Sequence, residues 1–306
     1  MAIESKFIWM DGELVESDKA AVPFLCAALH YGAAVFEGIR AYKTEGGPAV
    51  FRLAEHSRRL IQSAEIFGMR QLPYSAEQVA AAVIETVRAN GYDECYIRPL
   101  LFVRDSIAGL NLDKGRLSLG VAVWEWNAYY GEAALAAGVR ANISSFTRHH
   151  PNVMMTKAKV SGNYANSILA KTESERLGFD EAILLDPQGY VAECTGENLF
   201  VVKAGQVISP ELAPVLEGIT RDAVCRIAAD LGYPVVERQV SRDQLYSADE
   251  VFVTGTVAEV IGLREIDFRR IGAGAAGPVT RQIQAVFQRA VHGQEAKYAG
   301  WLTYAD

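Results

Sequence analysis

The stretch Met154-Met-Thr-Lys-Ala-Lys-Val-Ser-Gly-Asn-Tyr164 places two lysines, Lys157 and Lys159, in an apolar segment that runs into the start of a helix. Residues two apart in a β-strand point to the same face, so both lysines would face one way. An apolar setting favours the neutral amine, which Schiff-base chemistry with an aldehyde requires. The alternative is that both lysines are solvated on a strand face, as lysines usually are.

A candidate phosphate site lies further along the chain, at Gly218-Ile-Thr-Arg-Asp222. Here a glycine and a hydroxyl residue lead into a helix, with Arg221 and Asp222 expected in its first turn. The free N–H groups and the positive dipole end of a helix start can hold a phosphate. An ordinary Thr N-cap is the alternative. The turn Thr254-Gly-Thr-Val-Ala258 has a similar composition.

Acidic residues mark a third motif, Glu193-Cys-Thr-Gly-Glu-Asn-Leu-Phe200, in which a carboxylate ends a strand and a turn presents a second acid and an amide. A carboxylate that faces a pyridine nitrogen keeps it protonated and makes the ring an electron sink. The alternative is that Glu193 and Glu197 only line the rim of a turn. The three motifs together favour a common site.

Strands and helices are interspersed along the chain without the βαβ rhythm of a Rossmann domain. Asp11-Gly12, between two apolar segments, is a strong hairpin signal, and Pro99 suggests an edge or a bulge in its strand. Periodicity, caps and turn residues predict helices over 53–67, 75–91, 163–178, 222–231 and 278–291, and strands over 95–103, 117–126, 182–185 and 190–193. We therefore expect an α+β fold.

The composition indicates a globular protein with a small-molecule partner. The chain has 306 residues, half of them hydrophobic, which is enough for two domains. Its net charge of −7 argues against nucleic acid or an anionic membrane surface as partner. The four cysteines are scattered, so no disulfide framework or metal site is expected. No segment resembles a signal peptide or a membrane span, and we expect a cytoplasmic enzyme.

The three motifs, in this order, resemble the fold-type IV enzymes that use pyridoxal 5′-phosphate (PLP). Within that group the chain is most similar to the branched-chain amino acid aminotransferases. The stretches that carry this second likeness are His30-Tyr-Gly-Ala-Ala-Val-Phe-Glu-Gly-Ile-Arg40, Tyr96-Ile-Arg-Pro-Leu100 and Asp249-Glu-Val-Phe-Val-Thr-Gly-Thr-Val-Ala-Glu259. The resemblance covers nearly the whole chain.

The resemblance implies a two-domain α+β fold. A small N-terminal α+β domain would span residues 1–122, a connection residues 123–137, and a larger cofactor-binding domain with a barrel-like sheet residues 138–306. The cofactor would lie between the domains, and a homodimer would be the minimal unit.

The resemblance also implies the roles of site residues. Lys159 would form the internal aldimine with PLP, Glu193 would pair with the pyridine nitrogen, and Tyr164 would hydrogen-bond the phenolic oxygen. The phosphate would be held by Arg59, Ile219, Thr220 and Thr256. The substrate pocket would be built from Phe36, Gly38, Tyr96, Arg98, Trp126, Tyr129 and the backbone at Thr256 and Val257, with Tyr31 reaching in from the partner subunit.

The expected reaction is ping-pong transamination between L-leucine, L-isoleucine or L-valine and 2-oxoglutarate, with Lys159 as base and then acid. Siblings on the same scaffold are a D-amino-acid aminotransferase and an aminodeoxychorismate lyase. A cofactor-free binding or structural protein is the alternative from another class. The chain departs from the family pattern at Val257, where a second Ala is common, at Val160-Ser161, in place of a frequent small pair, and at Gly262, in place of the usual proline.

Overall fold

The computed structural model describes residues 4–106, 109–125 and 130–305, and the chain divides into two compact units. Unit 1 comprises residues 1–126, 157–163 and 290–306, and unit 2 comprises residues 127–156 and 164–289. This division differs from the expected segments 1–122, 123–137 and 138–306. Two later segments join unit 1 because Val160 forms a bridge with Val35 and because residues 302–304 pair with residues 49–51.

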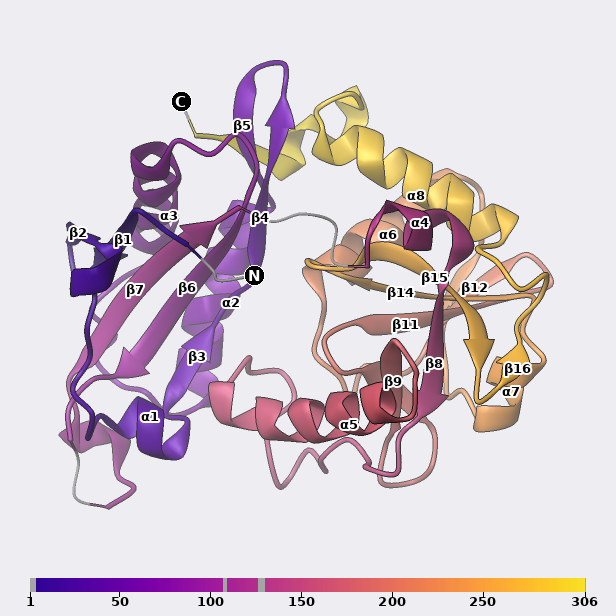
Figure 1. Ribbon diagram of the computed structural model, residues 1–306, viewed down its shortest axis with the longest axis horizontal. Helices are drawn as coiled ribbons and strands as arrows, with labels where there is room; N and C mark the ends of the chain where they lie inside the picture. Colours follow the sequence, from indigo (N-terminus) through magenta and orange to yellow (C-terminus); the bar gives the residue numbers. More distant parts are fainter. Residues whose placement is uncertain (1–3, 107–108, 126–129, 306) are drawn as a thin grey trace. The chain divides into compact units, whose positions relative to one another are not determined.

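Unit 1 is built on an eight-stranded sheet with the order β17-β5-β4-β6-β7-β1-β2, and β3 also pairs with β6 (Figure 1). Its strands are β1 Phe7–Met10, β2 Glu13–Glu16, β3 Ala34–Phe36, β4 Ile39–Thr44, β5 Gly47–Phe51, β6 Cys95–Val103, β7 Leu117–Trp124 and β17 Leu302–Tyr304. Its α-helices are α1 Ala27–Tyr31, α2 Leu53–Ile66 and α3 Ala76–Asn90, with short 3-10 turns at Ser17–Lys19, Leu112–Lys114 and Ala296–Trp301. Helices α2 and α3 pack on each other and on the sheet.

Local sequence signals account for the ends of several elements. Asp11 and Gly12 both have positive φ, 52° and 105°, as the tight turn between β1 and β2 requires. The hydroxyl of Ser75 accepts from the Gln78 N–H at 3.3 Å, and the Gln78 side chain accepts from the Ser75 N–H at 2.8 Å. Gly91, at a φ of 70°, then ends α3. The predicted hairpin and capping box are confirmed.

Pro99 lies inside the sheet, opposite a break in the neighbouring strand. β3 ends at Phe36 and β4 begins at Ile39, and both pair with β6 on the same side. At the break, the Glu37 N–H donates to the Pro99 carbonyl at 2.9 Å. A proline cannot donate to a sheet ladder, and here the partner strand is interrupted where the ladder would be. The break also places Glu37 and Gly38 outside regular β-structure.

Unit 2 contains a nine-stranded sheet with the order β10-β9-β8-β15-β14-β11-β12-β13, and β16 pairs with β15. Its strands are β8 Val139–Ile143, β9 Glu181–Leu185, β10 Val191–Cys194, β11 Asn198–Lys203, β12 Gln206–Ser209, β13 Val235–Glu237, β14 Glu250–Gly255, β15 Glu259–Ile266 and β16 Arg269–Arg270. Its helices are α4 Glu132–Ala137, α5 Tyr164–Arg176, α6 Ile219–Asp230 and α7 Arg242–Tyr246, and α8 spans Pro278–Val291.

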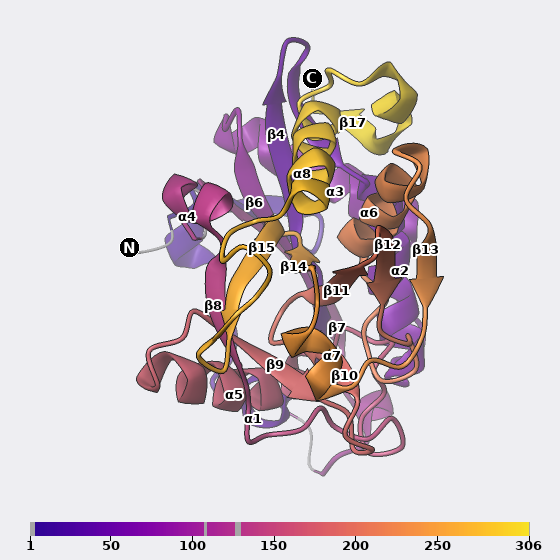
Figure 2. The ribbon, with the colours of Figure 1, turned by 90° about the vertical axis from the view of Figure 1, so that its right-hand side faces the viewer.

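The sheet of unit 2 curls on itself. β10 is first in the strand order and β11 is sixth, yet only residues 195–197 join them, and the Cys194 N–H donates to the Glu197 carbonyl at 2.8 Å. The strands between them must therefore bend round until the two meet, which makes the sheet barrel-like (Figure 2). The expected α+β class with a barrel-like sheet is confirmed.

Each unit has its own hydrophobic core. In unit 1 the core joins α2 and α3 to the sheet through residues such as Leu60, Val83 and Ile97. In unit 2 the inward side chains of the curled sheet, among them Ile183 and Val253, fill its interior. None of the helices within residues 4–106, 109–125 and 130–305 has the length and apolar character needed to cross a membrane.

One local prediction was wrong. Helix α6 begins at Ile219, three residues before the predicted start, because Gly218 in an extended conformation is its N-cap and Thr220 lies within its first turn. Residues 154–160 are not part of a strand, so the alternation of a strand does not orient Lys157 and Lys159. The Lys159 N–H donates to the Ser63 hydroxyl at 3.0 Å rather than to a strand, and only an isolated bridge joins Val160 to Val35.

Gly262, at the position where similar chains commonly have proline, lies in β15 opposite Phe252. A Cβ there would approach the Cα of Ala276 to 2.9 Å and its Cβ to 3.0 Å. Any residue with a side chain, proline included, would therefore force backbone atoms apart. The close packing of β15 against Ala276 explains the departure.

Replacing Gly262 by alanine should lower the free energy of unfolding by about 1 to 3 kcal/mol through overpacking. Denaturant unfolding of wild type and Gly262→Ala measures the loss. Gly300→Ala is the matched control, because no heavy atom of the described residues lies within 4 Å of its added Cβ. Equal stability of Gly262→Ala and the control would contradict the packing argument.

Candidate active site

Glu37 is the buried anchor of unit 1. It follows β3, is fully buried, and accepts two hydrogen bonds from Arg59 of α2, from Nε at 2.6 Å and from Nη2 at 2.8 Å. His56, one turn earlier on α2, lies with Nδ1 2.7 Å from Glu37 Oε2. This arrangement fixes the plane of the Arg59 guanidinium, a group well suited to bind a phosphate.

The charges of this group follow from burial and pairing. Burial opposes ionisation of Glu37, but Arg59 and His56 outweigh it and hold the pKa of the carboxyl well below its usual range. Burial lowers the pKa of His56, with smaller contributions from Arg59 and Lys159, against the opposing effect of Glu37. A neutral His56 can donate its Nδ1 hydrogen to the Glu37 carboxylate. Arg59 and Glu37 therefore form a charged pair, and His56 is a neutral hydrogen-bond donor to the Glu37 carboxylate.

Lys159 is held by its backbone beside Phe36. Its N–H donates to Ser63 of α2 at 3.0 Å, and its carbonyl accepts from the Phe36 N–H at 3.0 Å. The ammonium nitrogen lies 5.0 Å from the centroid of the Phe36 ring. Lys159 is half-buried. A partly buried lysine with a fixed backbone, next to an aromatic ring, is suited to covalent chemistry with a carbonyl compound.

Arg98 and three aromatic rings form a second group in unit 1. The Arg98 Cζ atom lies 4.7 Å from the ring centroid of Phe36, 5.2 Å from that of Tyr96 and 5.7 Å from that of Trp124. Arg98 also donates to the Tyr96 hydroxyl at 3.0 Å. A Cβ on Gly38 would lie 2.1 Å from that hydroxyl, so only glycine leaves room for it. Four predicted pocket residues, Phe36, Gly38, Tyr96 and Arg98, are therefore brought together.

In unit 2, Glu193 is buried and fixed from several sides. Arg148 Nε lies 2.7 Å from Glu193 Oε1. The other carboxylate oxygen, Glu193 Oε2, accepts from the Asn198 amide at 3.3 Å and from the Leu216 N–H at 3.2 Å. Asn198 also donates to the Leu216 carbonyl at 2.9 Å. A buried carboxylate held in this way presents a fixed negative charge, as pairing with a pyridinium nitrogen requires.

Asn198 also links Glu193 to the predicted phosphate turns. A Cβ on Gly218, the N-cap of α6, would lie 2.0 Å from Asn198 Oδ1. Among the described residues no side chain caps this helix start, and Ile219 and Thr220 form its first turn. Thr254 pairs with Asn198 across β14 and β11, and a Cβ on Gly255 would lie 3.1 Å from the Gly196 carbonyl. Glu193, the start of α6 and the turn at Gly255 are thus neighbours within unit 2.

The remaining predicted residues are less closely tied to these groups. Tyr164 is half-buried at the first position of α5, and Thr256 and Val257 are half-buried after β14. Tyr31 is 56% exposed at the end of α1. Trp126 and Tyr129 lie outside the described residues. Lys159 and Arg59 belong to unit 1, whereas Tyr164, Glu193, Ile219, Thr220 and Thr256 belong to unit 2.

Comparisons with known proteins identify the family of this chain. The family described as Amino-transferase class IV matches residues 34–266. The chain belongs to the class IV aminotransferase family. Over 303 residues it is 46% identical to a branched-chain-amino-acid aminotransferase of Pseudomonas aeruginosa, covering 99% of this chain and 98% of that protein. It is 42% identical to the Escherichia coli K12 enzyme of the same name over 301 residues, covering 98% and 97%.

A solved structure gives the same assignment. The T.th. branched-chain amino acid aminotransferase with pyridoxamine 5′-phosphate matches with a TM-score of 0.96 and 50% identity, over all of both chains. The chain is therefore a fold-type IV aminotransferase whose cofactor is PLP. A branched-chain aminotransferase activity is supported. A buried acid held by Arg148, close to the glycine-capped start of α6, fits the ring nitrogen and the phosphate of that cofactor.

Several residues that contact the predicted site residues were not themselves predicted as functional. Glu37 and Asn198 lie within motifs that were recognised, but no role was assigned to them. His56 and Arg148 carry no motif, and Trp124 takes part in the aromatic group next to the predicted Trp126. The spacing of His56 and Arg59 on one face of a helix is a signal for a shared partner, but only the fold identifies that partner as Glu37.

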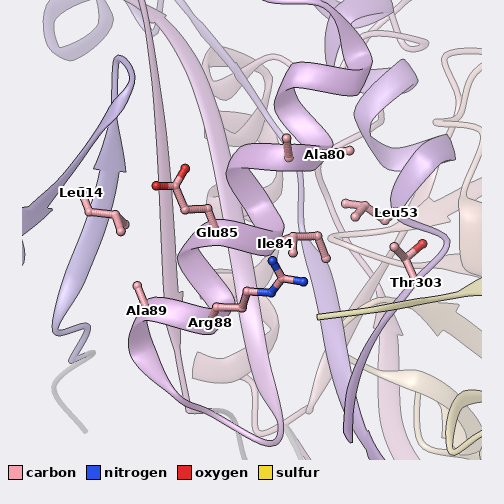
Figure 3. A pocket seen from close by; sticks show the side chains of 9 residues that line it. Leu14, Leu53, Ala80, Ile84, Glu85, Arg88, Ala89 and Thr303 are labelled. Atoms are coloured by element: carbon pink, nitrogen blue, oxygen red, sulfur yellow. The ribbon is translucent and has the colours of Figure 1, made fainter. Parts of the chain in front are cut away.

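A separate pocket of about 650 Å³ lies in unit 1, away from these residues (Figure 3). It is an open groove along α3, with Ala80, Ile84 and Arg88 on the helix, Leu14 from β2 and Thr303 from β17. None of the predicted site residues that the structure describes lines it. The groove is therefore distinct from the aminotransferase site.

Replacing Glu37 by glutamine should destabilise the aminotransferase by about 3 to 5 kcal/mol, because Arg59 would keep a partly buried charge without its carboxylate. The affinity for PLP should fall as well, since the guanidinium loses its orientation. Denaturant unfolding and equilibrium dialysis with PLP measure the two effects.

The matched control for this prediction is Glu65→Gln, also on α2. The Glu65 side chain is exposed, so removing its charge should change stability and PLP affinity little. If Glu37→Gln behaved like this control in both measurements, the anchoring role of Glu37 would be wrong.

Proposed function

We propose that this aminotransferase exchanges the amino group between L-leucine, L-isoleucine or L-valine and 2-oxoglutarate, giving branched-chain 2-oxo acids and L-glutamate in ping-pong order. The observation that supports it most is the buried Glu193, fixed by Arg148 and Asn198 beside the start of α6. PLP, when bound, supplies the electron sink for the bond changes at the α-carbon. Every other task falls to the side chains and backbone groups of the chain itself.

Lys159 is proposed as the residue that binds the cofactor covalently and moves the proton. Its ε-amine, released by the substrate amine, takes the proton from the substrate α-carbon and later returns a proton as an acid. Its backbone bonds to Ser63 and Phe36 hold it in place for both transfers. Glu193 holds the proton on the ring nitrogen, and Tyr164 donates to the phenolic oxygen.

Arg59, Ile219, Thr220 and Thr256 are proposed to hold the phosphate. Arg59 supplies a charge whose orientation Glu37 fixes. The N–H groups of Ile219 and Thr220 supply donors at the positive end of α6. Thr256, after the turn at Gly255, supplies a hydroxyl. Such a set fixes the cofactor by its phosphate independently of the covalent link at Lys159.

The substrate is proposed to lie against the Arg98 group, with Phe36, Gly38, Tyr96, Trp126, Tyr129 and Val257 as lining. The T.th. enzyme has been solved with 4-methylvaleric acid and with N-(5′-phosphopyridoxyl)-L-glutamate. The first ligand has a branched aliphatic chain and the second a glutamate moiety. The two ligands support the same pair of substrate classes for this chain.

A homodimer or higher homo-oligomer in the cytoplasm is part of the proposal. Tyr31 is proposed to reach the site of the partner subunit. Its exposure on α1, together with that of Phe24, Leu25 and Leu29, supports a contact surface at this end of unit 1. Large apolar side chains gathered on one surface are typical of protein interfaces.

The absorbance of the bound cofactor provides the direct test of substrate class. The purified holoenzyme should lose its aldehyde-form band when L-leucine is added without any 2-oxo acid, and 2-oxoglutarate should restore it. Bleaching by D-alanine alone would move the function to a D-amino-acid aminotransferase. A colourless protein that gains no band with PLP would contradict the enzyme assignment.

Replacing Lys159 by alanine should abolish transamination, because general acid-base catalysis by one positioned group typically contributes about 10²- to 10⁴-fold and the covalent link is lost too. Stopped-flow spectra with L-leucine measure the half-reaction. Lys157→Ala, two residues away in the same segment, is the matched control and should stay near the wild-type rate. A wild-type rate in Lys159→Ala would overturn the assignment.

A further inference from the structure

A second group of ionisable side chains lies in unit 2, next to the turn that follows Glu193. It consists of Glu181 of β9, Glu197 at the end of that turn, Lys171 of α5, and Tyr130, which precedes α4. Both glutamates are buried. The Tyr130 hydroxyl lies 3.1 Å from Glu181 Oε2 and 3.5 Å from Glu197 Oε1. One tyrosine hydroxyl thus stands between two buried carboxyl groups.

The hydrogen-bond donors are divided unequally between the two acids. Glu181 Oε1 accepts from the Ala182 N–H at 2.9 Å, from the Thr195 N–H at 3.1 Å and from the Thr195 hydroxyl. Glu181 Oε2 accepts from Lys171 Nζ at 2.8 Å and lies nearer to Tyr130. For Glu197, the one other donor among the described residues is the Gly196 N–H, at 3.1 Å. Glu181 is therefore compensated as an anion, and Glu197 is not.

A tyrosine hydroxyl has one hydrogen to donate and can accept another. Since the nearer acceptor is Glu181, the contact with Glu197 is satisfied when Glu197 is protonated and donates to the Tyr130 oxygen. The resulting chain runs from Glu197 through Tyr130 to Glu181 and ends at the ammonium group of Lys171. Two carboxylates that share so small a buried site cannot both ionise without a large cost.

Among the described residues, the other titratable groups near Glu197 are Cys194, Glu193 and Lys171, and of these Lys171 alone opposes a protonated Glu197. Cys194 of β10 is buried, and burial together with Glu181, Glu197 and Glu193 raises the pKa of its thiol well above its usual range. The thiol is thus neutral and supplies no charge. The charge of Glu193 is negative and paired with Arg148. Lys171 is a cation that favours an ionised Glu197, but it already pairs with Glu181.

The group lies against the predicted cofactor turns. A Cβ on Gly255 would approach the Glu197 Cγ to 3.3 Å, so Glu197 packs directly on the turn that leads to Thr256. Glu197 also precedes Asn198, whose amide donates to Glu193. The position of Glu197 therefore affects both the acid proposed for the ring nitrogen and the turn proposed for the phosphate.

We propose that Glu197 is protonated in the folded enzyme and, by donating to Tyr130, is a positioning residue for Asn198, Glu193 and the Gly255 turn. The positioning role rests on the proposed function, whereas the protonation does not. Burial, then Glu181, raises the pKa of Glu197 to about 8, against the effects of Lys171, Gly196 and Tyr130.

The carboxyl proton of Glu197 makes the stability of the folded enzyme depend on pH. Above its ordinary pKa of 4.5, Glu197 loses its proton in the unfolded chain but keeps it in the folded one. The folded state is thus stabilised fully below pH 4.5, and this contribution decreases as the pH rises towards about 8. Above that value Glu197 ionises in the folded enzyme, and its hydrogen bond to Tyr130 is lost.

Infrared difference spectra of the holoenzyme test the protonation directly. Wild type at about pH 7 should show the carbonyl band of a protonated carboxyl, and the band should disappear above about pH 8. Glu197→Gln should lack the band at every pH. Glu211→Gln, which removes an exposed carboxylate, is the control and should leave it unchanged.

Two variants test the positioning role. Glutamine reproduces the neutral acid and can donate to Tyr130, so Glu197→Gln should keep its PLP dissociation constant within about twofold of wild type. Its melting temperature should rise relative to wild type as the pH increases to about 9, since it has no proton to lose. Glu197→Ala should raise the PLP dissociation constant about tenfold, because Tyr130 and the turn lose their contact.

The outcomes separate the two proposals. Absence of the infrared band, or a glutamine variant as impaired as the alanine variant, would overturn the inference. If the alanine variant does not fold, the band and the pH dependence of Glu197→Gln still decide it. A band that behaves as expected in a protein without transaminase activity would support the protonation and contradict the proposed function instead.

Discussion

The burial of the Glu37 carboxylate is the constraint on which the site in unit 1 depends. A charge without access to water is stable only when partners surround it, and removing one partner is costly. Arg59 and His56 can reach Glu37 only if α2 packs on the sheet at one position along its axis. That position also places Ser63, one turn further on, where it accepts from the Lys159 N–H. One ion pair thus links the proposed phosphate ligand to the proposed catalytic lysine.

In unit 2 the central group that connects the proposed site residues is an amide rather than a carboxylate. Asn198 is neutral. Its side chain donates to Glu193 and to the Leu216 carbonyl, and its oxygen lies where a Cβ on Gly218 would be. It therefore joins the acid, the helix start and the strand that leads to the Gly255 turn without adding charge. A Cβ at position 218 would overlap the Asn198 side-chain oxygen, and a Cβ at position 255 would press on the Gly196 carbonyl and on Glu197. The proposed phosphate turns thus coincide with close packing.

The sequence predicted the elements whose signals are local. The Asp11-Gly12 turn and the Ser75 capping box depend on residues a few positions apart, and both have the predicted form. The backbone of Lys159 donates to the Ser63 side chain of α2, a contact between distant segments that the sequence could not indicate. Short motifs were enough to propose Lys159 and Glu193 as site residues. The contacts of Glu37, Arg148 and Trp124 could not be proposed in this way, because they join segments distant in the chain.

The aromatic group around Arg98 supports the proposal that one pocket accepts two unlike side chains. An aliphatic substrate would leave an ordinary buried arginine without a partner, which is the usual basis for rejecting it. Here the guanidinium already lies over Phe36, Tyr96 and Trp124 and donates to the Tyr96 hydroxyl. Ring faces stabilise a desolvated cation, so it need not wait for a substrate carboxylate. When a glutamate side chain binds instead, the same cation can attract it, and the rings still offer an apolar wall to leucine. The proposed breadth of specificity would then follow from a guanidinium that the three rings and the Tyr96 hydroxyl stabilise with either substrate.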